Sequence, residues 1–354
     1  MKTIDIVMPT GGSRGGVEYV INAWTKSAIS NLYNLRVFHI SPGPCDYLEG
    51  YEKQWTMPLS ETGETELDVE YCARCYGSFV SQYGPPDICI ATWIPIVTSA
   101  CKVVRTKGDY NFIILSWLHS EIDVYKKQGW GGLEHLAFAD YHLCISKKTE
   151  KEIKSSYPDA KTFFIGNPIK MPHKENRVGD ERLICFIGRI SKEKRLDIIL
   201  NAISSAKDNH WKLKIIGDGD EKEKMMGLAK TLEIDNRVDF TGWKDNPWDY
   251  VGASTVFIVA SDYEGFCVTA HEASALGMTV ITTPVNGCID YIVPGKNGYY
   301  FDGSIKNLTE ILDYISDGML PLCDKNNCED SVLPFMSDNY FLKLKKIFES
   351  ICGG

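Results

Sequence analysis

The sequence predicts an α/β protein made of two doubly wound domains, each with a parallel sheet covered by helices on both faces. The chain has 354 residues, more than a single hydrophobic core usually serves. Short β-branched runs alternate with helical patterns along its length, which is typical of βαβ units. The expected strands are apolar at nearly every position, as in parallel sheets that are buried on both faces.

The expected strands form two groups of about six. Those of the first group are 3–8, 35–40, 87–91, 112–116, 141–145 and 162–165. Those of the second group are 183–188, 212–216, 237–241, 255–260, 279–283 and 298–301. The main helical patterns between them are 17–30, 146–156, 195–206, 221–232, 267–277 and 305–316. Two groups of this kind indicate two Rossmann-like domains.

A polar segment with two prolines, residues 166–181, separates the two groups of strands. We therefore expect an N-terminal domain over residues 1–168 and a C-terminal domain over residues 169–334. The remaining residues, 335–354, carry a helical pattern. Its apolar face contains Phe341, Leu344, Ile347 and Ile351. We expect this helix to pack back on the N-terminal domain.

Composition excludes several classes of protein. The formal net charge is −9, whereas a nucleic-acid binder normally has a basic surplus. No apolar run approaches the ~20 residues of a membrane span. Most of the 12 cysteines lie in apolar runs, and the first residues turn polar too soon for a secretory signal, so we expect a cytoplasmic protein. Cys72 and Cys75 have redox-motif spacing, but no second pair follows and a structural role is favoured.

Candidate sites lie in the loops after the strands, because open α/β sheets bind ligands beyond the carboxyl ends of their strands. The first loop, "PTGGSRGGVEYVI" at residues 9–21, opens a helix and contains four glycines. Glycine lets the backbone approach a ligand, and a helix N-terminus favours an anion. The spacing is neither a dinucleotide fingerprint nor a P-loop. A flexible turn is the alternative.

Two further loops that follow strands carry candidate side chains. One loop carries a basic pair and the other a histidine. Arg189 follows the strand at 183–188, and Lys194 comes five residues later. A guanidinium and an ammonium are a common pair for a diphosphate, although a solvated basic turn is the alternative. His119 lies just beyond the strand at 112–116. We expect it to face a ligand, with a purely structural histidine as the alternative.

The segment "DGDE" at residues 218–221 offers a metal-binding alternative. Asp218 and Asp220 have the spacing of carboxylates that hold Mg²⁺ or Mn²⁺ against a nucleotide diphosphate. We favour a glycine-rich turn in which Asp220 caps a helix that begins at Glu221. The basic pair upstream would make a metal redundant, so no metal is expected.

Glu264 and Glu272 bracket the segment "EGFCVTAHE" after the strand at 255–260. If this segment is helical, its rise separates the two carboxylates by roughly 12 Å along the axis. The catalytic carboxylates of glycosidases lie closer, about 5–9.5 Å apart. The spacing instead suits two contacts on one elongated ligand, with phosphate between them at the helix N-terminus.

Together these segments resemble the retaining GT-B glycosyltransferases of family GT4. The likeness covers nearly the whole chain. It is carried by "GGVE" at 15–18, "GRISKEKRLD" at 188–197, "IIGDGDE" at 215–221, "EGFCVTAHEASALG" at 264–277 and "PGKNGYYF" at 294–301. Within the family, the chain is similar to bacterial lipopolysaccharide-core hexosyltransferases that use UDP-galactose to form 1,6 linkages. That narrower likeness is carried by "ADYHLCIS" at 139–146, "GNPI" at 166–169 and "GWKDNPWDYV" at 242–251.

The resemblance implies a GT-B fold with two domains facing a central cleft, and it implies roles for the polar residues. Arg189 and Lys194 would hold the donor diphosphate, and Glu272 would bind the ribose hydroxyls. The backbone amides of Val268 and Thr269 would meet phosphate at the helix start.

The same resemblance implies contacts to the sugar and the base. Glu264 would hold the donor hexose with the amides of three residues, which are Gly265, Phe266 and Cys267. Cys267 stands where the family often has glycine or proline. His119 would reach the sugar near the reacting carbon. Val238 and Trp243 would contact the base. Gly15 and Gly16 would let the N-terminal domain approach the phosphates.

The function implied is transfer of a hexose, with galactose as the first candidate, from a UDP-sugar to a lipopolysaccharide core or another lipid-linked glycan. The resemblance implies retention of configuration without a metal or other cofactor. A non-catalytic sugar-nucleotide-binding partner subunit and a GT-B epimerase or phosphorylase remain as alternatives.

Basic clusters in the N-terminal domain suggest peripheral docking at the inner face of a membrane, with Trp130 inserting at the interface. The clusters are Lys102, Arg105 and Lys107; Lys126 and Lys127; and Lys147, Lys148, Lys151 and Lys154. Ordinary solvated helix faces are the alternative.

Overall fold

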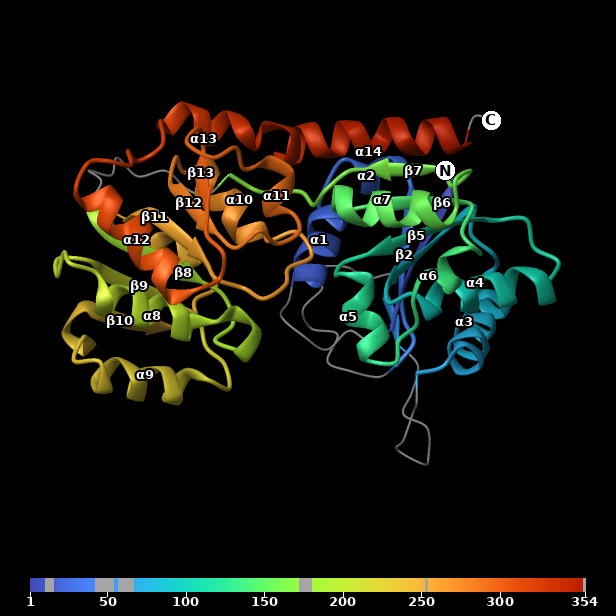
Figure 1. Cartoon of the computed structure of the whole chain (residues 1–354). Coiled ribbons are helices and arrows are strands. Elements are labelled where there is room, and N and C mark those ends of the chain that lie inside the picture. Colours follow the sequence, from blue (N-terminus) through green and yellow to red (C-terminus); the bar gives the residue numbers. More distant parts are fainter. Residues whose placement is uncertain (10–15, 42–53, 57–66, 172–179, 252–253, 353–354) are drawn as a thin grey trace. The chain divides into compact units, whose positions relative to one another are not determined.

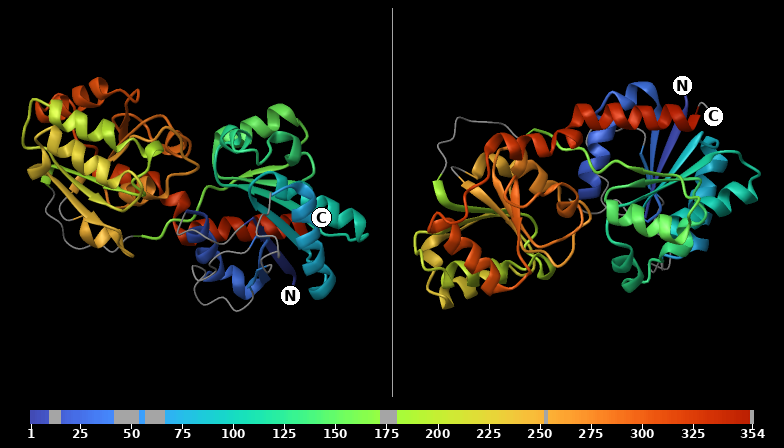
Figure 2. Two further views of the ribbon diagram at one scale, coloured as in Figure 1. Left: turned by 90° about the horizontal axis from the view of Figure 1, so that it is seen from below. Right: turned by 45° about the horizontal axis from the view of Figure 1, so that its top comes forward.

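In the computed structural model the chain divides into two compact units. Unit 1 comprises Met1–Pro168 and Ser337–Gly354, and unit 2 comprises Ile169–Met336. The structure describes residues 1–9, 16–41, 54–56, 67–171, 180–251 and 254–352. Figures 1 and 2 show that each unit is a sheet with helices packed on both faces.

Unit 1 is built on a seven-stranded sheet in the order β3-β2-β1-β4-β5-β6-β7, and all its neighbouring strands are parallel. The strands are β1 (Thr3–Met8), β2 (Asn34–His39), β3 (Gln54–Thr56), β4 (Ile88–Trp93), β5 (Ile113–Leu118), β6 (Tyr141–Cys144) and β7 (Thr162–Phe164). Six of these strands were predicted, and their first and last residues lie within two positions of the predicted bounds. The strand β3 was not predicted, because three residues are too few to show a periodic pattern.

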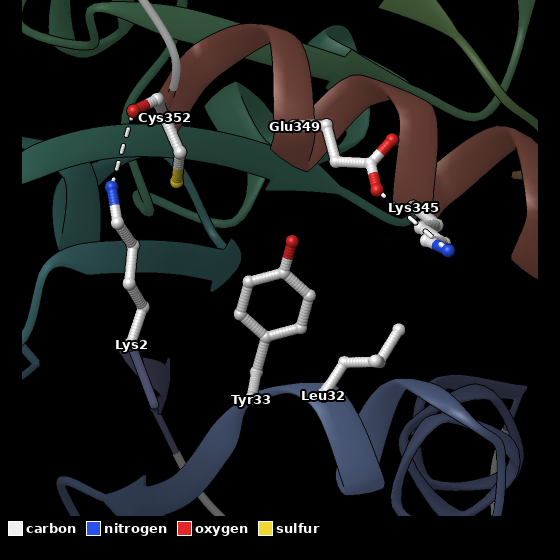
Figure 3. Close-up of a pocket in the computed structure, with 6 residues that line it drawn as sticks. All are labelled: Lys2, Leu32, Tyr33, Lys345, Glu349 and Cys352. Carbon is white, nitrogen blue, oxygen red and sulfur yellow. Dashed lines mark hydrogen bonds and ion pairs between the residues drawn. The ribbon is translucent and has the colours of Figure 1, made fainter.

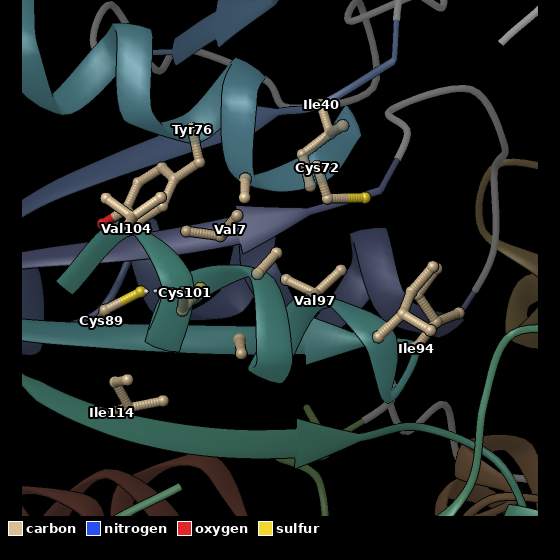
Figure 4. Packing of buried hydrophobic residues seen from close by; sticks show 14 of the residues in the cluster. Val7, Ile40, Cys72, Tyr76, Cys89, Ile94, Val97, Cys101, Val104 and Ile114 are labelled. Atoms are coloured by element: carbon tan, nitrogen blue, oxygen red, sulfur yellow. Dashed lines mark hydrogen bonds between the residues drawn. The ribbon is translucent and has the colours of Figure 1, made fainter. Parts of the chain in front are cut away.

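Helices of unit 1 cover the two faces of this sheet. They are α1 (Gly16–Thr25), α2 (Ile29–Leu32), α3 (Val69–Tyr83), α4 (Ile96–Lys107), α5 (Ile122–Lys127), α6 (Leu133–Leu136), α7 (Lys147–Ser156) and α14 (Ser337–Cys352). Figure 4 shows the core that α3 and α4 form with β1, β4 and β5. Cys72 and Cys75 lie in this core, and burial raises the pKa of the Cys72 thiol to about 12. Both cysteines therefore serve packing here.

The helix expected over residues 17–30 is interrupted, so that part of the prediction is wrong. The Ser27 hydroxyl donates to the Trp24 carbonyl at 2.7 Å and accepts from the Ile29 amide at 3.2 Å. A serine that bonds its neighbouring backbone in this way competes with helical hydrogen bonds. The chain consequently forms α1, a short turn and α2.

The C-terminal helix α14 packs on unit 1 through aromatic contacts. The Trp24 indole donates to the Tyr340 hydroxyl at 3.1 Å, and both side chains are fully buried. Trp24 also stacks on Trp117 at 4.4 Å and meets Phe348 edge-on at 6.0 Å. Of the expected apolar face, Leu344, Ile347 and Ile351 are buried, whereas Phe341 is only half-buried.

Unit 2 contains a six-stranded parallel sheet in the order β10-β9-β8-β11-β12-β13. Its strands are β8 (Asp180–Ile187), β9 (Lys212–Ile216), β10 (Val238–Gly242), β11 (Ser254–Val259), β12 (Thr279–Thr282) and β13 (Gly298–Tyr300). Its α-helices are α8 (Leu196–Ser205), α9 (Lys222–Thr231), α10 (Val268–Ala275), α11 (Cys288–Tyr291), α12 (Ile305–Ser316) and α13 (Lys325–Ser331). Its 3-10 turns are η1 (Lys192–Lys194), η2 (Asp235–Arg237), η3 (Pro247–Tyr250) and η4 (Leu333–Phe335).

A buried ion pair joins β1 to β2 inside unit 1. The Arg36 guanidinium donates to both carboxylate oxygens of Asp5, at 2.6 and 2.9 Å, and the Tyr76 hydroxyl donates to the same carboxylate at 2.7 Å. Burial raises the pKa of Asp5, against the opposing attraction of Arg36. Two further Arg36 bonds reach the carbonyls of Tyr83 and Gly84, so the guanidinium also anchors the end of α3.

We predict that Asp5→Asn destabilises unit 1 by about 3–5 kcal/mol, because it leaves the buried Arg36 charge without a counterion. Urea unfolding measures this loss. Glu349→Ala is the control in the same unit, since it removes an exposed pair with Lys345 at 3.7 Å that is worth at most about 1 kcal/mol. Equal effects of the two substitutions would contradict the prediction.

Candidate functional site

The candidate site residues of unit 2, which are the predicted donor residues and the alternative metal ligand Asp218, follow neighbouring strands of its sheet. Arg189 comes after β8, Asp218 after β9, Trp243 after β10 and Glu264 after β11. Because all strand pairs in this sheet are parallel, the loops that carry these residues leave the same carboxyl edge. The ribbon views show this common edge (Figures 1 and 2).

Glycines bring the first two loops into backbone contact. A Cβ at Gly217 would overlap the carbonyl of Gly188, and one at Gly219 would overlap that of Ile190. The Ile190 amide donates to the Asp218 carbonyl at 2.9 Å. The Arg189 side chain is exposed beside this contact. Small residues are therefore required for the close packing that presents Arg189 at the edge of the sheet.

Lys194 and Glu264 meet directly, although 70 residues separate them in the chain. The Lys194 ammonium donates to Glu264 Oε1 at 2.6 Å, and the Ser261 hydroxyl donates to the same oxygen at 2.7 Å. Burial works to lower the pKa of Lys194, but the attraction of Glu264 and other nearby groups outweighs it and raises the pKa. The Asp262 amide donates to the Glu193 carbonyl at 2.8 Å. These bonds hold a charged lysine against the loop after β11.

The N-terminus of α10 presents unpaired backbone amides. Its N-cap residue, Cys267, has left-handed backbone angles (φ 58°, ψ 63°) and supplies no side-chain cap. Within the described part of the chain, the amides of Val268 and Thr269 make no hydrogen bond to the protein. Amides at a helix start and the helix dipole favour an anion. This turn can therefore bind a phosphate group.

Aromatic rings inside unit 2 hold the loop before α10 in place. The Phe266 side chain is buried and stacks on His271 at 4.0 Å, while Phe335 meets both rings edge-on. His271 Nδ1 donates to the Cys267 carbonyl at 3.1 Å. Burial lowers the pKa of His271 to about 3, so the ring is neutral. Only the backbone of Phe266 is consequently available to a ligand.

Glu272 lies one turn into α10 with a buried side chain. The Trp248 indole donates to its Oε2 at 2.8 Å, and both residues are less than a tenth exposed. The estimate of 12 Å between the two glutamates does not apply, because the helix begins at Val268 and Glu264 precedes it. Trp248, Ser261 and His271 were not predicted from the sequence. Trp248 contacts Glu272 across 24 residues, and Ser261 and His271 contact residues three to five positions away.

The two residues expected at the base lie at opposite ends of β10. Val238 is the first residue of the strand, and its half-buried side chain packs against the core of unit 2. Trp243 follows the last residue and has a side chain that is 47% exposed. The structure thus places Trp243, but not Val238, at the edge where the other donor residues lie.

The Asp218–Asp220 segment forms a turn closed by its own hydrogen bonds. Asp218 accepts from the Gly219 amide and from Lys222, both at 2.9 Å, and these bonds lower its pKa. The expected cap by Asp220 is wrong, because α9 begins at Lys222 and its N-cap residue is Glu221, without a side-chain cap bond. In the described residues, no group of three or more His, Cys, Asp or Glu side chains is arranged to hold a metal ion.

In unit 1, His119 follows the carboxyl end of β5 and is held by Thr92. The Thr92 hydroxyl donates to the Trp117 carbonyl at 3.1 Å, so it accepts from His119 Nε2 at 3.0 Å. The proton therefore resides on Nε2, which leaves Nδ1 as an acceptor. Nδ1 is buried and bonds to none of the described residues. Burial lowers the pKa of His119 to about 3.

The glycines predicted to approach the phosphates lie at the start of α1. Gly16 is its first residue and is exposed, and a Cβ at this position would meet nothing within 4 Å. Gly15 falls outside the described residues. Gly16 and His119 both follow strands of the same parallel sheet, at its carboxyl edge.

Comparisons with known proteins identify the family. Residues 169–324 match the family described as glycosyl transferases group 1. Over 279 residues the chain is 30% identical to a lipopolysaccharide 1,6-galactosyltransferase of Escherichia coli strain K12, and the match covers 75% of each protein. The chain belongs to the group 1 glycosyltransferases.

Solved structures show that this glycosyltransferase has the GT-B fold, as predicted. The apo form of the lipopolysaccharide outer core galactosyltransferase WaaB matches with a TM-score of 0.80 and 24% identity, covering 98% of this chain and 99% of WaaB. The Anabaena protein Alr3699/HepE in complex with UDP also gives 0.80, at 14% identity, covering 99% of this chain and all of that one. The predicted doubly wound architecture is thereby confirmed.

Most lysines in the basic clusters of the glycosyltransferase are exposed, but several have partners. Lys148 pairs with Glu121 at 2.8 Å and Lys154 with Glu150 at 3.1 Å. Trp130 is partly buried and packs against the unit 1 core, and its insertion at a membrane interface stays a prediction. None of the described helices has both the length and the apolar character needed to span a membrane.

Two pockets are lined by none of the predicted donor residues. Figure 3 shows one of about 370 Å³, between α14 and the start of β1, lined by residues that include Lys2, Tyr33 and Cys352. It lies near the amino end of β1, whereas ligands of such sheets bind at the carboxyl edge. The other, about 530 Å³ between η1 and α9, is lined by charges that pair among themselves, as Arg195 does with Asp197 and Asp262.

We predict that the stability of unit 1 falls as pH falls below about 6.5, the ordinary pKa of an unfolded histidine. Because His119 has a folded-state pKa of about 3, the unfolded state binds more protons between these values, and lower pH favours it. His119→Gln should reduce the slope of unfolding free energy against pH by about 1.4 kcal/mol per pH unit between pH 4 and 6. Urea unfolding at several pH values measures the slope, and an unchanged slope would refute the assignment.

Proposed function

We propose that this glycosyltransferase moves a hexose, with galactose as the first candidate, from a UDP-sugar to a lipopolysaccharide core or another lipid-linked glycan. The observation that carries the proposal is the hydrogen-bonded pair of Lys194 and Glu264, in which Glu264 shortly precedes the unbonded backbone amides of Val268 and Thr269. This arrangement combines a cation and a helix start for phosphates with a carboxylate for sugar hydroxyls. The Escherichia coli relative and the UDP complex of the Anabaena protein support the choice of donor.

The proposed chemistry rests on stabilising the leaving group. Breaking the bond between sugar and diphosphate adds negative charge to the UDP oxygens and positive charge to the sugar carbon. Arg189, Lys194 and the α10 N-terminus would stabilise the negative charge. The neutral His119, with Nδ1 as an acceptor, would take a hydrogen bond from a donor-sugar hydroxyl. We place this enzyme in family GT4 and propose that it needs no metal ion.

We predict that Lys194→Met lowers kcat/KM for the UDP-sugar by at least about a hundredfold, as expected for a group that stabilises transition-state charge. Isothermal titration with UDP, UDP-galactose and UDP-glucose identifies the donor, and UDP release measures turnover. Lys192→Met is the matched control, since Lys192 is an exposed lysine of the same 3-10 turn.

Near-normal turnover of Lys194→Met would remove Lys194 from the phosphate site. EDTA should leave the activity unchanged. If EDTA abolished the activity and Mn²⁺ restored it, the enzyme would need a metal ion. Asp218 and Asp220 would then be the candidate metal ligands.

We propose that transfer proceeds with retention, through front-face attack in which the leaving phosphate helps to deprotonate the acceptor hydroxyl. Glu264 would bind the sugar instead of attacking it, because its Oε1 already accepts two hydrogen bonds. NMR of the anomeric proton should show an α-linked product from an α-linked donor. A β-linked product would overturn this mechanism.

We propose further that unit 1 docks on anionic membranes at the cytoplasmic face of the inner membrane, where a lipid-linked acceptor would lie. Exposed lysines on α5 and α7 would bind anionic headgroups. Sedimentation with anionic vesicles at low salt should carry the protein down, and the double variant Lys126→Glu, Lys127→Glu should bind more weakly. Lys230→Glu, an exposed change on α9 of unit 2, is the control. Absence of binding to anionic vesicles would exclude this mode of docking.

A further inference from the structure

The connection between β10 and β11 contains a buried indole that contacts the predicted ribose-binding carboxylate. Trp248 is the second residue of η3, after Pro247, and only 4% of it is exposed. Its Nε1 donates to Glu272 Oε2 at 2.8 Å, across 24 residues of sequence. Its ring packs against Phe257 of β11 at 6.0 Å. The indole is therefore fixed by the sheet on one side and by α10 on the other.

This contact can determine the orientation of the Glu272 carboxylate. A glutamate side chain has three rotatable bonds, and holding it in one rotamer costs conformational entropy. The indole N–H is a donor only and belongs to a rigid ring, so it holds one carboxylate oxygen in a defined place. A carboxylate accepts about four hydrogen bonds in all, and the indole takes one of them.

The two glutamates of the donor loop are thus positioned by different elements. Ser261 and Lys194 hold Glu264, whereas Trp248 holds Glu272. The Trp248 connection also begins with Trp243, whose exposed ring is predicted to meet the base. One short segment therefore carries both the expected base contact and the residue that orients the expected ribose contact.

We propose that Trp248 is a positioning residue for the nucleotide, which orients Glu272 for the ribose hydroxyls and so makes the site selective for ribonucleotides over deoxyribonucleotides. The proposal rests on the proposed role of Glu272 in binding a UDP-sugar. A site built to hydrogen-bond a hydroxyl discriminates strongly against ligands that lack it. That discrimination requires the acceptor to be held in place, and removing the Trp248 indole removes a bond that fixes Oε2 of the carboxylate.

The test compares the affinities of the protein for UDP, 2′-deoxy-UDP and 3′-deoxy-UDP by isothermal titration. The unmodified protein should bind UDP at least about tenfold more tightly than one of the deoxy analogues, the size of one lost hydrogen bond to a charged group. In Trp248→Phe the affinities for UDP and for that analogue should differ by no more than about threefold, mainly because UDP binds more weakly. KM for the donor should rise more than kcat falls, since Trp248 touches no reacting atom.

Trp211→Phe is the matched control. Trp211 is fully buried in the same unit, and its indole donates to Ser316 Oγ at 3.0 Å. Both substitutions therefore remove a buried indole and one hydrogen bond, and both lower the melting temperature. Only Trp248→Phe should change the ratio of affinities. Trp248→His, which keeps a ring N–H, should restore part of the discrimination and serves as a second variant if Trp248→Phe fails to fold.

The possible outcomes are distinct. If the unmodified protein discriminates and folded Trp248→Phe keeps the full ratio, the positioning role is wrong and the proposed function stands. If Trp248→Phe does not fold, an unchanged ratio in Trp248→His overturns the positioning role in its place. If the unmodified protein binds UDP and its deoxy analogues equally, ribose recognition by Glu272 is wrong and the inference fails with it. If it binds no UDP, the proposed donor is wrong as well. Loss of the ratio in Trp211→Phe would show that the effect is general instability and would also overturn the inference.

Discussion

Parallel strand pairing is the constraint on which the proposed donor site of unit 2 depends. Since every strand of the sheet runs in the same direction, the chain leaves β8, β9, β10 and β11 at one edge and delivers four separate loops there. Side chains far apart in sequence, such as Lys194 and Glu264, become direct neighbours. Gly217 and Gly219 let the loops after β8 and β9 approach closely, so the backbone of these two loops is in contact before any ligand binds.

The positions of the strands could be predicted because each is a short apolar run that both faces of the sheet bury. The failures have local physical causes. Ser27 interrupts a helical pattern through its hydroxyl, and Asp220 was expected as a cap although α9 begins one residue later than the pattern suggested. Val238 was assigned to the base by resemblance although it starts its strand. Each error concerns the position or hydrogen bonds of a single side chain, which the pattern of a whole segment does not show.

The donor residues were predicted by their place after strands and by resemblance, whereas the residues that hold them were not. Trp248 contacts Glu272 across 24 residues of sequence, whereas Ser261 and His271 contact residues three to five positions away. In neither case does the sequence show which side chains meet. A sequence therefore indicates which groups could touch a ligand more readily than which neighbours orient them.

The chain order of the two units has a consequence for synthesis on the ribosome. Unit 2 is one continuous stretch, whereas unit 1 is completed only by α14, which supplies the Tyr340 hydroxyl to the buried indole of Trp24. The first 168 residues emerge without this partner, and the apolar surface that α14 covers stays open until α14 has been synthesised. Unit 2 can thus reach its native state first, and the N-terminal segment is the part of the nascent chain that would most need protection from aggregation.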